Sequence, residues 1–100
     1  MKCLAILLAA VAPLLVAAQP DCDISKLVSI TASSNGKTCS QKTGFQPYQP
    51  PSGATIGKMC KVNECKALVN ELDRAFPREC KVFAFKLRAS VIDPVKRCPK

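Results

Sequence analysis

The sequence predicts a small, mainly helical domain that is held together by disulfide bonds. Three observations lead to this prediction: an amphipathic segment over residues 58–76, six cysteines after an N-terminal leader, and a length of 100 residues. A chain this short buries limited apolar area, so cross-links usually supply part of its stability. We therefore expect one domain, stapled by disulfides.

Residues 1–18 form the leader. Lys2 is followed by an apolar run that ends in Val-Ala-Ala at residues 16–18, which is typical of a secretory signal peptide cleaved before Gln19. A membrane anchor would need about 20 apolar residues, and Pro13 interrupts this run. We predict a secreted, extracellular mature domain over residues 19–100, with no integral membrane segment.

The cysteines indicate an oxidising compartment. Cleavage removes Cys3 from the seven cysteines of the chain and leaves an even set: Cys22, Cys39, Cys60, Cys65, Cys80 and Cys98. An even number in a short secreted chain indicates a disulfide framework. Each bridge typically contributes about 2–4 kcal/mol, and the bridges that close long loops contribute most.

We predict that residues 58–76 form the central helix. Its apolar side chains recur at steps of three and four residues and share one face: Cys65, Leu68, Val69, Leu72 and Phe76. Ser52 or Thr55 is suited to cap its start, and Pro77 ends the helical pattern near Phe76.

Two cysteines within this helix restrict the disulfide pairing. On a helix, Cys60 and Cys65 would be separated by roughly 140° of rotation and about 7.5 Å of rise. A disulfide requires Cα atoms within about 7 Å and Cβ atoms that face each other. We therefore expect each cysteine to bond to another part of the chain, which leaves about 12 of the 15 pairings that six cysteines allow.

The chain before the central helix is predicted to contain a short helix, a turn and a loop. Asp23 is suited to cap a helix within residues 21–33. The Asn-Gly pair at residues 35–36 predicts a tight turn with positive φ, and the glycines and prolines of residues 38–53 predict an ordered loop. Loops on a rigid scaffold often carry function.

Two interpretations stay open for residues 81–91. Phe83, Phe85 and Leu87 alternate with polar or small residues, which favours a half-buried strand. Phe83, Leu87 and Val91 also fit a helix, because they recur at four-residue steps. The Asp-Pro pair at residues 93–94 is expected to break the run.

The residues that most enzymes need are missing. The chain has no histidine, which excludes Ser-His and Cys-His mechanisms and histidine-based zinc sites. We interpret the carboxylates around the central helix as ion-pairing groups rather than as an acid/base pair: Glu64, Glu71, Asp73 and Glu79. With no glycine-rich phosphate loop either, we predict no enzyme activity, no catalytic residue, no cofactor and no metal site.

The chain is basic, with a formal net charge of +8, but acidic residues are interleaved with the lysines and arginines. We interpret this as a mixed, soluble surface, and attraction to anionic cell surfaces or polysaccharide is the alternative. We predict no nucleic-acid partner, because recognition motifs are absent and aromatic residues are few.

Two stretches resemble the elicitins, a family of small secreted six-cysteine proteins of oomycetes. One runs from Lys-Met-Cys at residues 58–60 through Cys65 and the amphipathic segment to Pro77 and Cys80. The other is Leu-Val-Ser-Ile at residues 27–30, followed by a Ser/Asn-rich turn and Cys39. The resemblance covers residues 22–98. It indicates a divergent member, which has Ile56 where typical members carry a tyrosine.

The resemblance implies the family's fold and disulfides. This fold is a small helical bundle with a short two-stranded sheet and an ordered loop, enclosing an apolar cavity. The family's pairing would give Cys22–Cys80, Cys39–Cys65 and Cys60–Cys98. Family members bind sterols in the cavity, shuttle them between membranes, and elicit plant defence and the hypersensitive response.

Three hypotheses follow from this resemblance and from the charge. The first is a carrier of sterol or another lipid, in a pocket lined by Leu27, Ile30, Met59, Leu68, Leu72, Phe76, Phe83 and Leu87. The second is an effector that a host plasma-membrane receptor recognises without a lipid load, through Lys58, Lys61, Lys66, Arg74 and Arg78. The third is a basic protein that disrupts membranes.

Overall fold

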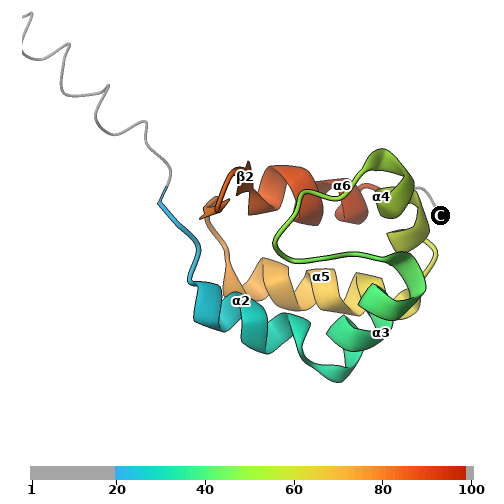
Figure 1. The fold of residues 1–100 in the computed structure, drawn as a ribbon. Coiled ribbons are helices and arrows are strands. Elements are labelled where there is room, and N and C mark those ends of the chain that lie inside the picture. Colours follow the sequence, from blue (N-terminus) through green and yellow to red (C-terminus); the bar gives the residue numbers. More distant parts are fainter. Residues whose placement is uncertain (1–19, 99–100) are drawn as a thin grey trace, which may run out of the picture.

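The computed structural model describes residues 20–98, and the predicted signal peptide lies outside the described residues. The elements follow in the order α2 (Ile24–Thr31), α3 (Ser34–Thr43), α4 (Gly53–Met59), α5 (Asn63–Ala75), β1 (Lys81–Val82), β2 (Phe85–Lys86), the π-helical segment η1 (Arg88–Ile92) and α6 (Asp93–Lys96). The structure confirms a mainly helical fold with a short two-stranded antiparallel sheet and three disulfides (Figure 1).

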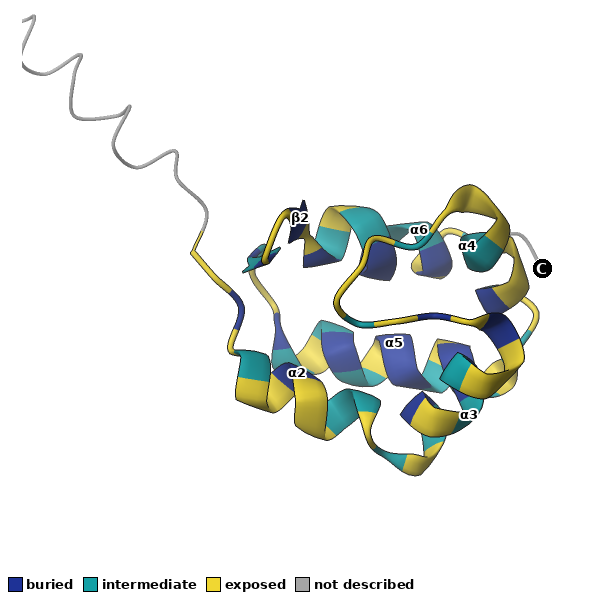
Figure 2. Cartoon of the chain, viewed as in Figure 1, coloured by how far each residue is buried: buried dark blue, intermediate teal, exposed yellow. Residues whose placement is uncertain are grey.

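Helix α5 is the element around which the others pack. It contacts α2, α3, α4, η1 and α6, and Figure 1 shows α2 and α3 on one side of it and the η1–α6 segment on the other. The predicted apolar face is buried, with Leu68, Val69 and Leu72 at most 1% exposed. Buried residues of α5 and of the C-terminal segment face each other across the interior (Figure 2).

The prediction of one unbroken helix over residues 58–76 is wrong at its start. Helix α4 ends at Met59, and the chain becomes extended at Val62, with φ −112° and ψ 118°, before α5 begins. Cys60 and Cys65 therefore lie on opposite sides of a break. Ser52 caps α4, accepting the N–H of Thr55 at 3.2 Å.

The three disulfides join Cys22 to Cys80, Cys39 to Cys65 and Cys60 to Cys98, with Cα–Cα distances of 4.9, 4.8 and 5.6 Å. These are the three pairs that the family resemblance implies. In each pair, one cysteine lies just before α5, within it or shortly after it. The three cross-links therefore hold other parts of the chain to α5 and to the segments on either side of it.

The predicted turn at residues 35–36 is instead the first turn of α3. Asp23 caps α2 as expected, accepting the N–H of Lys26 at 3.2 Å. Ser33 then caps α3, accepting the N–H of Gly36 at 3.3 Å. The loop predicted over residues 38–53 is shorter as a result: α3 continues to Thr43 and ends at Gly44, whose φ is +79°.

Gly36 is required by close packing and not by a positive φ. A Cβ atom at this position would lie 2.1 Å from the carbonyl oxygen of Thr31, at the end of α2. The absence of a side chain therefore lets the first turn of α3 lie directly against α2.

Residues 81–91 contain both of the predicted structures, strand in the first part and helix in the second. β1 and β2 form a hairpin in which Val82 pairs with Phe85, and helical structure begins immediately afterwards. The expected break at residues 93–94 is wrong, because the helix continues into α6. Pro94 has no N–H for the ordinary helical hydrogen bond, and the turn before it widens, with the N–H of Asp93 donating to the carbonyl of Arg88.

We predict that Gly36→Ala destabilises the protein by about 1–3 kcal/mol or more, because the added methyl group would overlap the Thr31 carbonyl. Gly57→Ala is the matched control: it lies within α4 with no atom within 4 Å of the new Cβ, and should stabilise by roughly 0.4–1 kcal/mol. Denaturant unfolding with intact disulfides measures both. Equal effects would contradict the packing argument.

Candidate lipid-binding site

Six of the eight predicted lipid-binding residues meet in the core. They are at most 6% exposed and belong to one apolar cluster: Leu27, Met59, Leu68, Leu72, Phe76 and Leu87. Ile30 packs against this cluster and is half-buried. Phe83 departs from the expectation, because it lies in the turn of the hairpin and is 64% exposed.

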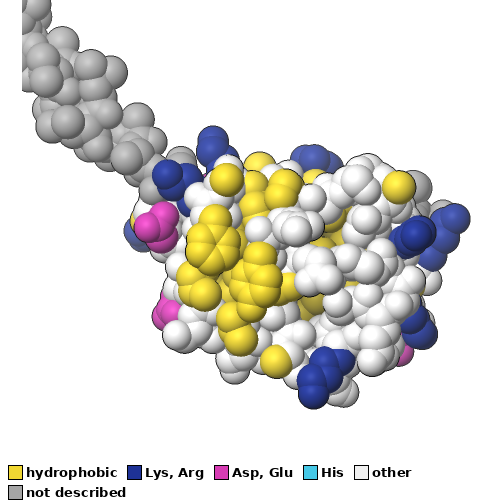
Figure 3. All heavy atoms as spheres, viewed as in Figure 1, with side chains coloured by type: hydrophobic (Ala, Val, Ile, Leu, Met, Phe, Trp, Pro, Cys, Tyr) yellow, Lys and Arg dark blue, Asp and Glu magenta, His cyan; other side chains and the backbone are white. Residues whose placement is uncertain are grey.

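An apolar groove opens at the surface beside this core. It has a volume of about 230 Å³ and lies between α2, α3 and the loop that follows α3. Its lining is Val28, Thr31, Ala32, Gly36, Ser40, Phe45, Pro47 and Tyr48. Hydrophobic side chains gather on this face of the molecule, over α2, the loop and the hairpin (Figure 3).

Phe45 separates the groove from the core. It lines the groove, yet it is only 3% exposed and belongs to the core cluster. A second, more polar pocket of about 220 Å³ lies between Phe45, the rest of the loop and the start of α4. Pockets therefore flank the loop over residues 44–52 on two sides, with Phe45 bounding both.

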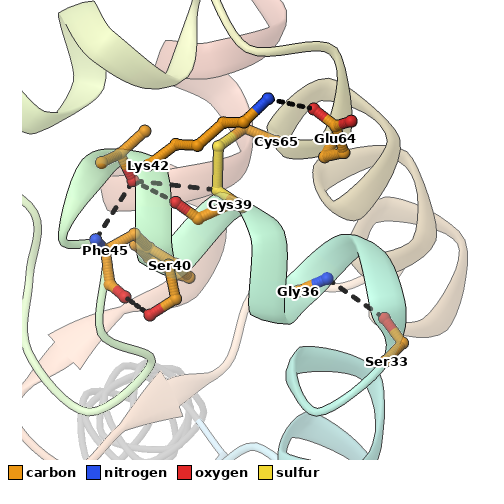
Figure 4. The surroundings of a disulfide bond; sticks show 9 residues. Ser33, Gly36, Cys39, Ser40, Lys42, Phe45, Glu64 and Cys65 are labelled. Atoms are coloured by element: carbon orange, nitrogen blue, oxygen red, sulfur yellow. Dashed lines mark hydrogen bonds and ion pairs between the residues drawn. A yellow bond between two sulfur atoms is a disulfide. The ribbon is translucent and has the colours of Figure 1, made fainter.

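The start of this loop is firmly anchored to α3 (Figure 4). The buried hydroxyl of Thr43 donates to the carbonyl of Cys39 at 2.7 Å and accepts the N–H of Phe45 at 3.1 Å. The hydroxyl of Ser40 donates to the carbonyl of Phe45 at 2.7 Å. Because Cys39 is bonded to Cys65, these hydrogen bonds tie the loop's start to α5.

The middle of the loop is held much more weakly. Within the described part of the chain, the hydrogen bond of residues 46–51 stays inside the loop, from the N–H of Gln49 to the carbonyl of Gln46 at 3.4 Å. The ring of Tyr48 contacts that of Phe83, with centroids 6.2 Å apart. This aromatic contact links the loop to the hairpin. Displacing residues 46–51 would break few interactions.

The groove also contains hydroxyl groups. The hydroxyl of Thr31 donates to the carbonyl of Leu27 at 2.9 Å, and the hydroxyl of Ser40 donates to the carbonyl of Phe45. The side chain of Tyr48 is 48% exposed at the mouth of the groove, with its hydroxyl free of hydrogen bonds to other described residues. A tyrosine can both donate and accept, so Tyr48 is suited to meet the single polar group of an otherwise apolar ligand.

A charged network locks the C-terminal segment to the end of α5. Asp73 binds Lys96 at 2.7 Å and Arg88 at 2.6 Å, and Arg88 also donates to the carbonyl of Phe76 at 2.7 Å. The hydrogen bonds from Lys96 and Arg88 lower the pKa of Asp73 below its ordinary value of 3.8.

The other carboxylates near α5 differ in role. Glu64 pairs with Lys42 at 3.5 Å, as the ion-pair interpretation predicts. Glu79 instead accepts the backbone N–H groups of Cys80, Arg88 and Ala89 at 2.8–3.1 Å, and so caps η1. One oxygen of Glu71 is buried without a partner among the described residues, so the ion-pair interpretation fails for this side chain.

Residues 20–98 contain no group of three side chains placed to hold a metal ion. None of the helices in this range is both long and apolar enough to cross a bilayer. The site that the geometry offers is an apolar core beneath a loop with a weakly held middle.

The comparison with protein families agrees with this architecture. A family model described as Elicitin matches residues 21–98, which contain all six paired cysteines. The chain belongs to the elicitin family. Family membership and the three disulfides are consistent with a secreted elicitin-like protein. No curated protein and no solved structure matches this chain.

Sequence reasoning identified the core of this elicitin but not its groove. The groove depends on α3, which was expected to be a turn and a loop, and on Phe45, which bends back from the loop into the core. The one available signal was the placement of Phe45 and Tyr48 among the glycines and prolines of a loop expected to be ordered.

We predict that Asp73→Asn lowers stability in a pH-dependent way. Because folding lowers the pKa of Asp73, its carboxylate stabilises the native state above the unfolded pKa, and this contribution is lost as pH falls through the folded value. The gap in urea midpoint between wild type and Asp73→Asn should therefore be largest near neutral pH and close in acid below pH 3.8.

Lys58→Gln, which changes one exposed charge outside this network, controls for net charge. If the difference in urea midpoint between wild type and Asp73→Asn is the same in strong acid as at neutral pH, the carboxylate does not act through its charge.

Proposed function

We propose that this elicitin binds a sterol, or another lipid of similar size, in an apolar cavity that forms when residues 46–51 move away from the core. The observation that supports this most directly is the position of Phe45, a core residue that is also the wall of a surface groove. Once residues 46–51 have moved, the Phe45 ring could turn out of the core while its backbone stays bonded to Thr43 and Ser40, and this would join the groove to the core.

The size of the groove supports a moving loop rather than a fixed pocket. Pockets for drug-sized ligands usually have volumes of about 300–1,000 Å³, whereas the groove has about 230 Å³. The side chains proposed to contact the lipid are otherwise packed together in the core. We infer that the ligand replaces the contacts that Phe45 and the loop make in the closed form.

The disulfides fit this proposal, because they leave the loop free. Cys39–Cys65 and Cys60–Cys98 anchor the two helices that border the loop, while no cysteine lies within residues 44–52. The frame can therefore stay in place as the loop moves. Burial of apolar surface, about 25 cal/mol per Å², would provide most of the binding free energy, and Tyr48 would meet the sterol hydroxyl.

Elicitation of plant defence is a further part of the proposed function, and it could be independent of the lipid. All five basic residues considered for receptor recognition are exposed: Lys58, Lys61, Lys66, Arg74 and Arg78. They lie on α4, on α5 and in the connections next to α5, away from the groove lining. We propose binding and recognition, and not catalysis, as the activity of this chain.

A fluorescent-sterol titration tests the carrier function. Tyr48 is the sole tyrosine and the chain has no tryptophan, so energy transfer to bound dehydroergosterol reports on the groove directly. We expect saturable, stoichiometric binding. Ala32→Phe, at the rim of the groove, should weaken it about tenfold by filling the space the lipid needs. Ala54→Phe, on an exposed position of α4 outside the groove, should not.

Thermal unfolding of both variants verifies that they fold. Absence of saturable binding to the wild type would remove the carrier function and favour recognition without a lipid. Equal binding by Ala32→Phe and Ala54→Phe would place the lipid somewhere other than the groove.

A further inference from the structure

The turn of the β1–β2 hairpin contains a residue that the local backbone disfavours. Phe83 has a φ of +55°, and it is the only non-glycine residue with positive φ in the described range. Glycine or asparagine adopts this conformation at lower cost than a bulky aromatic residue. Because Phe83 is 64% exposed, burial of its ring within this molecule does not compensate for that cost. Such outliers often occur at functional positions.

The strands of the same hairpin carry a second unfavourable feature. Lys81 and Lys86 are directly opposite each other in the register, and like charges in such a pair destabilise a sheet. The alternate positions, Val82 and Phe85, are buried. The hairpin therefore has a buried apolar face, an outer face with two lysines and an exposed aromatic ring at its turn.

The ring of Phe83 is part of a larger apolar patch. Val28, Tyr48 and Phe83 are the large hydrophobic residues that stay exposed in the described chain, at 38%, 48% and 64%. They come from α2, the loop and the hairpin, and the rings of Tyr48 and Phe83 are in contact. Figure 3 shows the hydrophobic side chains gathered on one face, with lysine and arginine side chains above them and acidic side chains at their left border.

We propose that this aromatic patch, together with Lys81 and Lys86, docks the protein onto an anionic lipid bilayer. Aromatic rings with one polar end, as in Tyr48, favour the interface between headgroups and acyl chains. An anionic surface would also relieve the repulsion between the paired lysines, and it attracts the net positive charge of the chain. Asp21 pairs with Lys81 in a backbone bridge and offsets part of this charge, so one negative residue lies beside the two lysines of the strands.

The size of the patch favours a bilayer over a protein partner. A stable protein interface buries about 800 Å² on each partner, and three partly exposed side chains provide much less. A bilayer needs no matching shape, because the rings insert individually while long lysine side chains reach the headgroups.

Docking in this orientation has a consequence that rests on the proposed function. Val28 and Tyr48 line both the patch and the groove, so the mouth of the groove would face the membrane. A lipid could then pass from the bilayer to the core without crossing water. The docking itself does not require that the groove hold a lipid.

Vesicle binding of the full mature chain tests the proposal. We expect co-sedimentation with vesicles of phosphatidylcholine and phosphatidylserine, weaker binding to phosphatidylcholine alone, and loss of affinity as salt rises. Tyrosine fluorescence should be quenched by lipids brominated on their acyl chains, because Tyr48 is the only tyrosine. Phe83→Asn should lower the affinity about tenfold and, because asparagine suits the positive φ, should leave the fold intact.

Lys86→Gln should lower the affinity about fivefold, as expected for one lysine near an anionic surface. Lys58→Gln carries the same charge change on an exposed position of α4 and should have a much smaller effect. Unchanged vesicle binding by Phe83→Asn, or equal losses for Lys86→Gln and Lys58→Gln, would overturn the proposal. So would a wild-type dimer in free solution that Phe83→Asn converts to a monomer, because a second copy would then cover the patch.

The same variants in the sterol titration keep the two proposals distinguishable. The docking surface is supported directly if the Phe83→Asn variant loses vesicle binding but still binds dehydroergosterol in free solution. Loss of sterol binding by the Ala32→Phe variant with vesicle binding retained also supports it, because the two activities then separate.

Discussion

Cross-linking of distant parts of the chain to α5 and to the segments that flank it is the constraint on which the rest of this structure depends. Cys60 precedes this helix, Cys65 lies within it and Cys80 follows it, and their partners lie in three other parts of the chain. The bridges span 58, 26 and 38 residues, so they remove much of the freedom of the unfolded chain. A small domain with few aromatic residues thereby keeps its architecture without a large core.

A frame held in this way can carry a loop that contributes little to stability. The loop over residues 44–52 is fixed at its start by Thr43 and Ser40, and at its end by the cap of α4. Between these points its contacts are an internal hydrogen bond and the Tyr48–Phe83 pair. Regions with few buried contacts open locally at a small fraction of the global unfolding free energy, so the same sequence can combine a stable bundle with an accessible interior.

The sequence predicts the helical class, the buried face of α5 and the cap of α2, because each depends on local periodicity or on one capping side chain. It also indicates Ser52 as a cap, but for the central helix rather than for α4. What it could not provide depends on tertiary packing. The Asn-Gly pattern predicts a turn at Gly36, whereas the role of this glycine is to let α3 pack directly against Thr31. The sequence around the break at Val62 has no glycine or proline that would predict it. The family resemblance places Phe83 in the pocket, whereas the pattern of residues 81–91 fits both a strand and a helix and predicts no turn at this position.

Hydrogen exchange of the Phe45 amide is the most direct test of a rigid frame with a movable loop. This N–H is buried and bonded to Thr43, so it exchanges when movement of residues 46–51 lets water reach it and that hydrogen bond opens. We expect exchange that is faster than at Leu68 and Leu72 of α5 and nearly independent of denaturant. Exchange of Phe45 with the same free energy and denaturant dependence as those α5 amides would mean that the loop opens only on global unfolding, and would contradict the account.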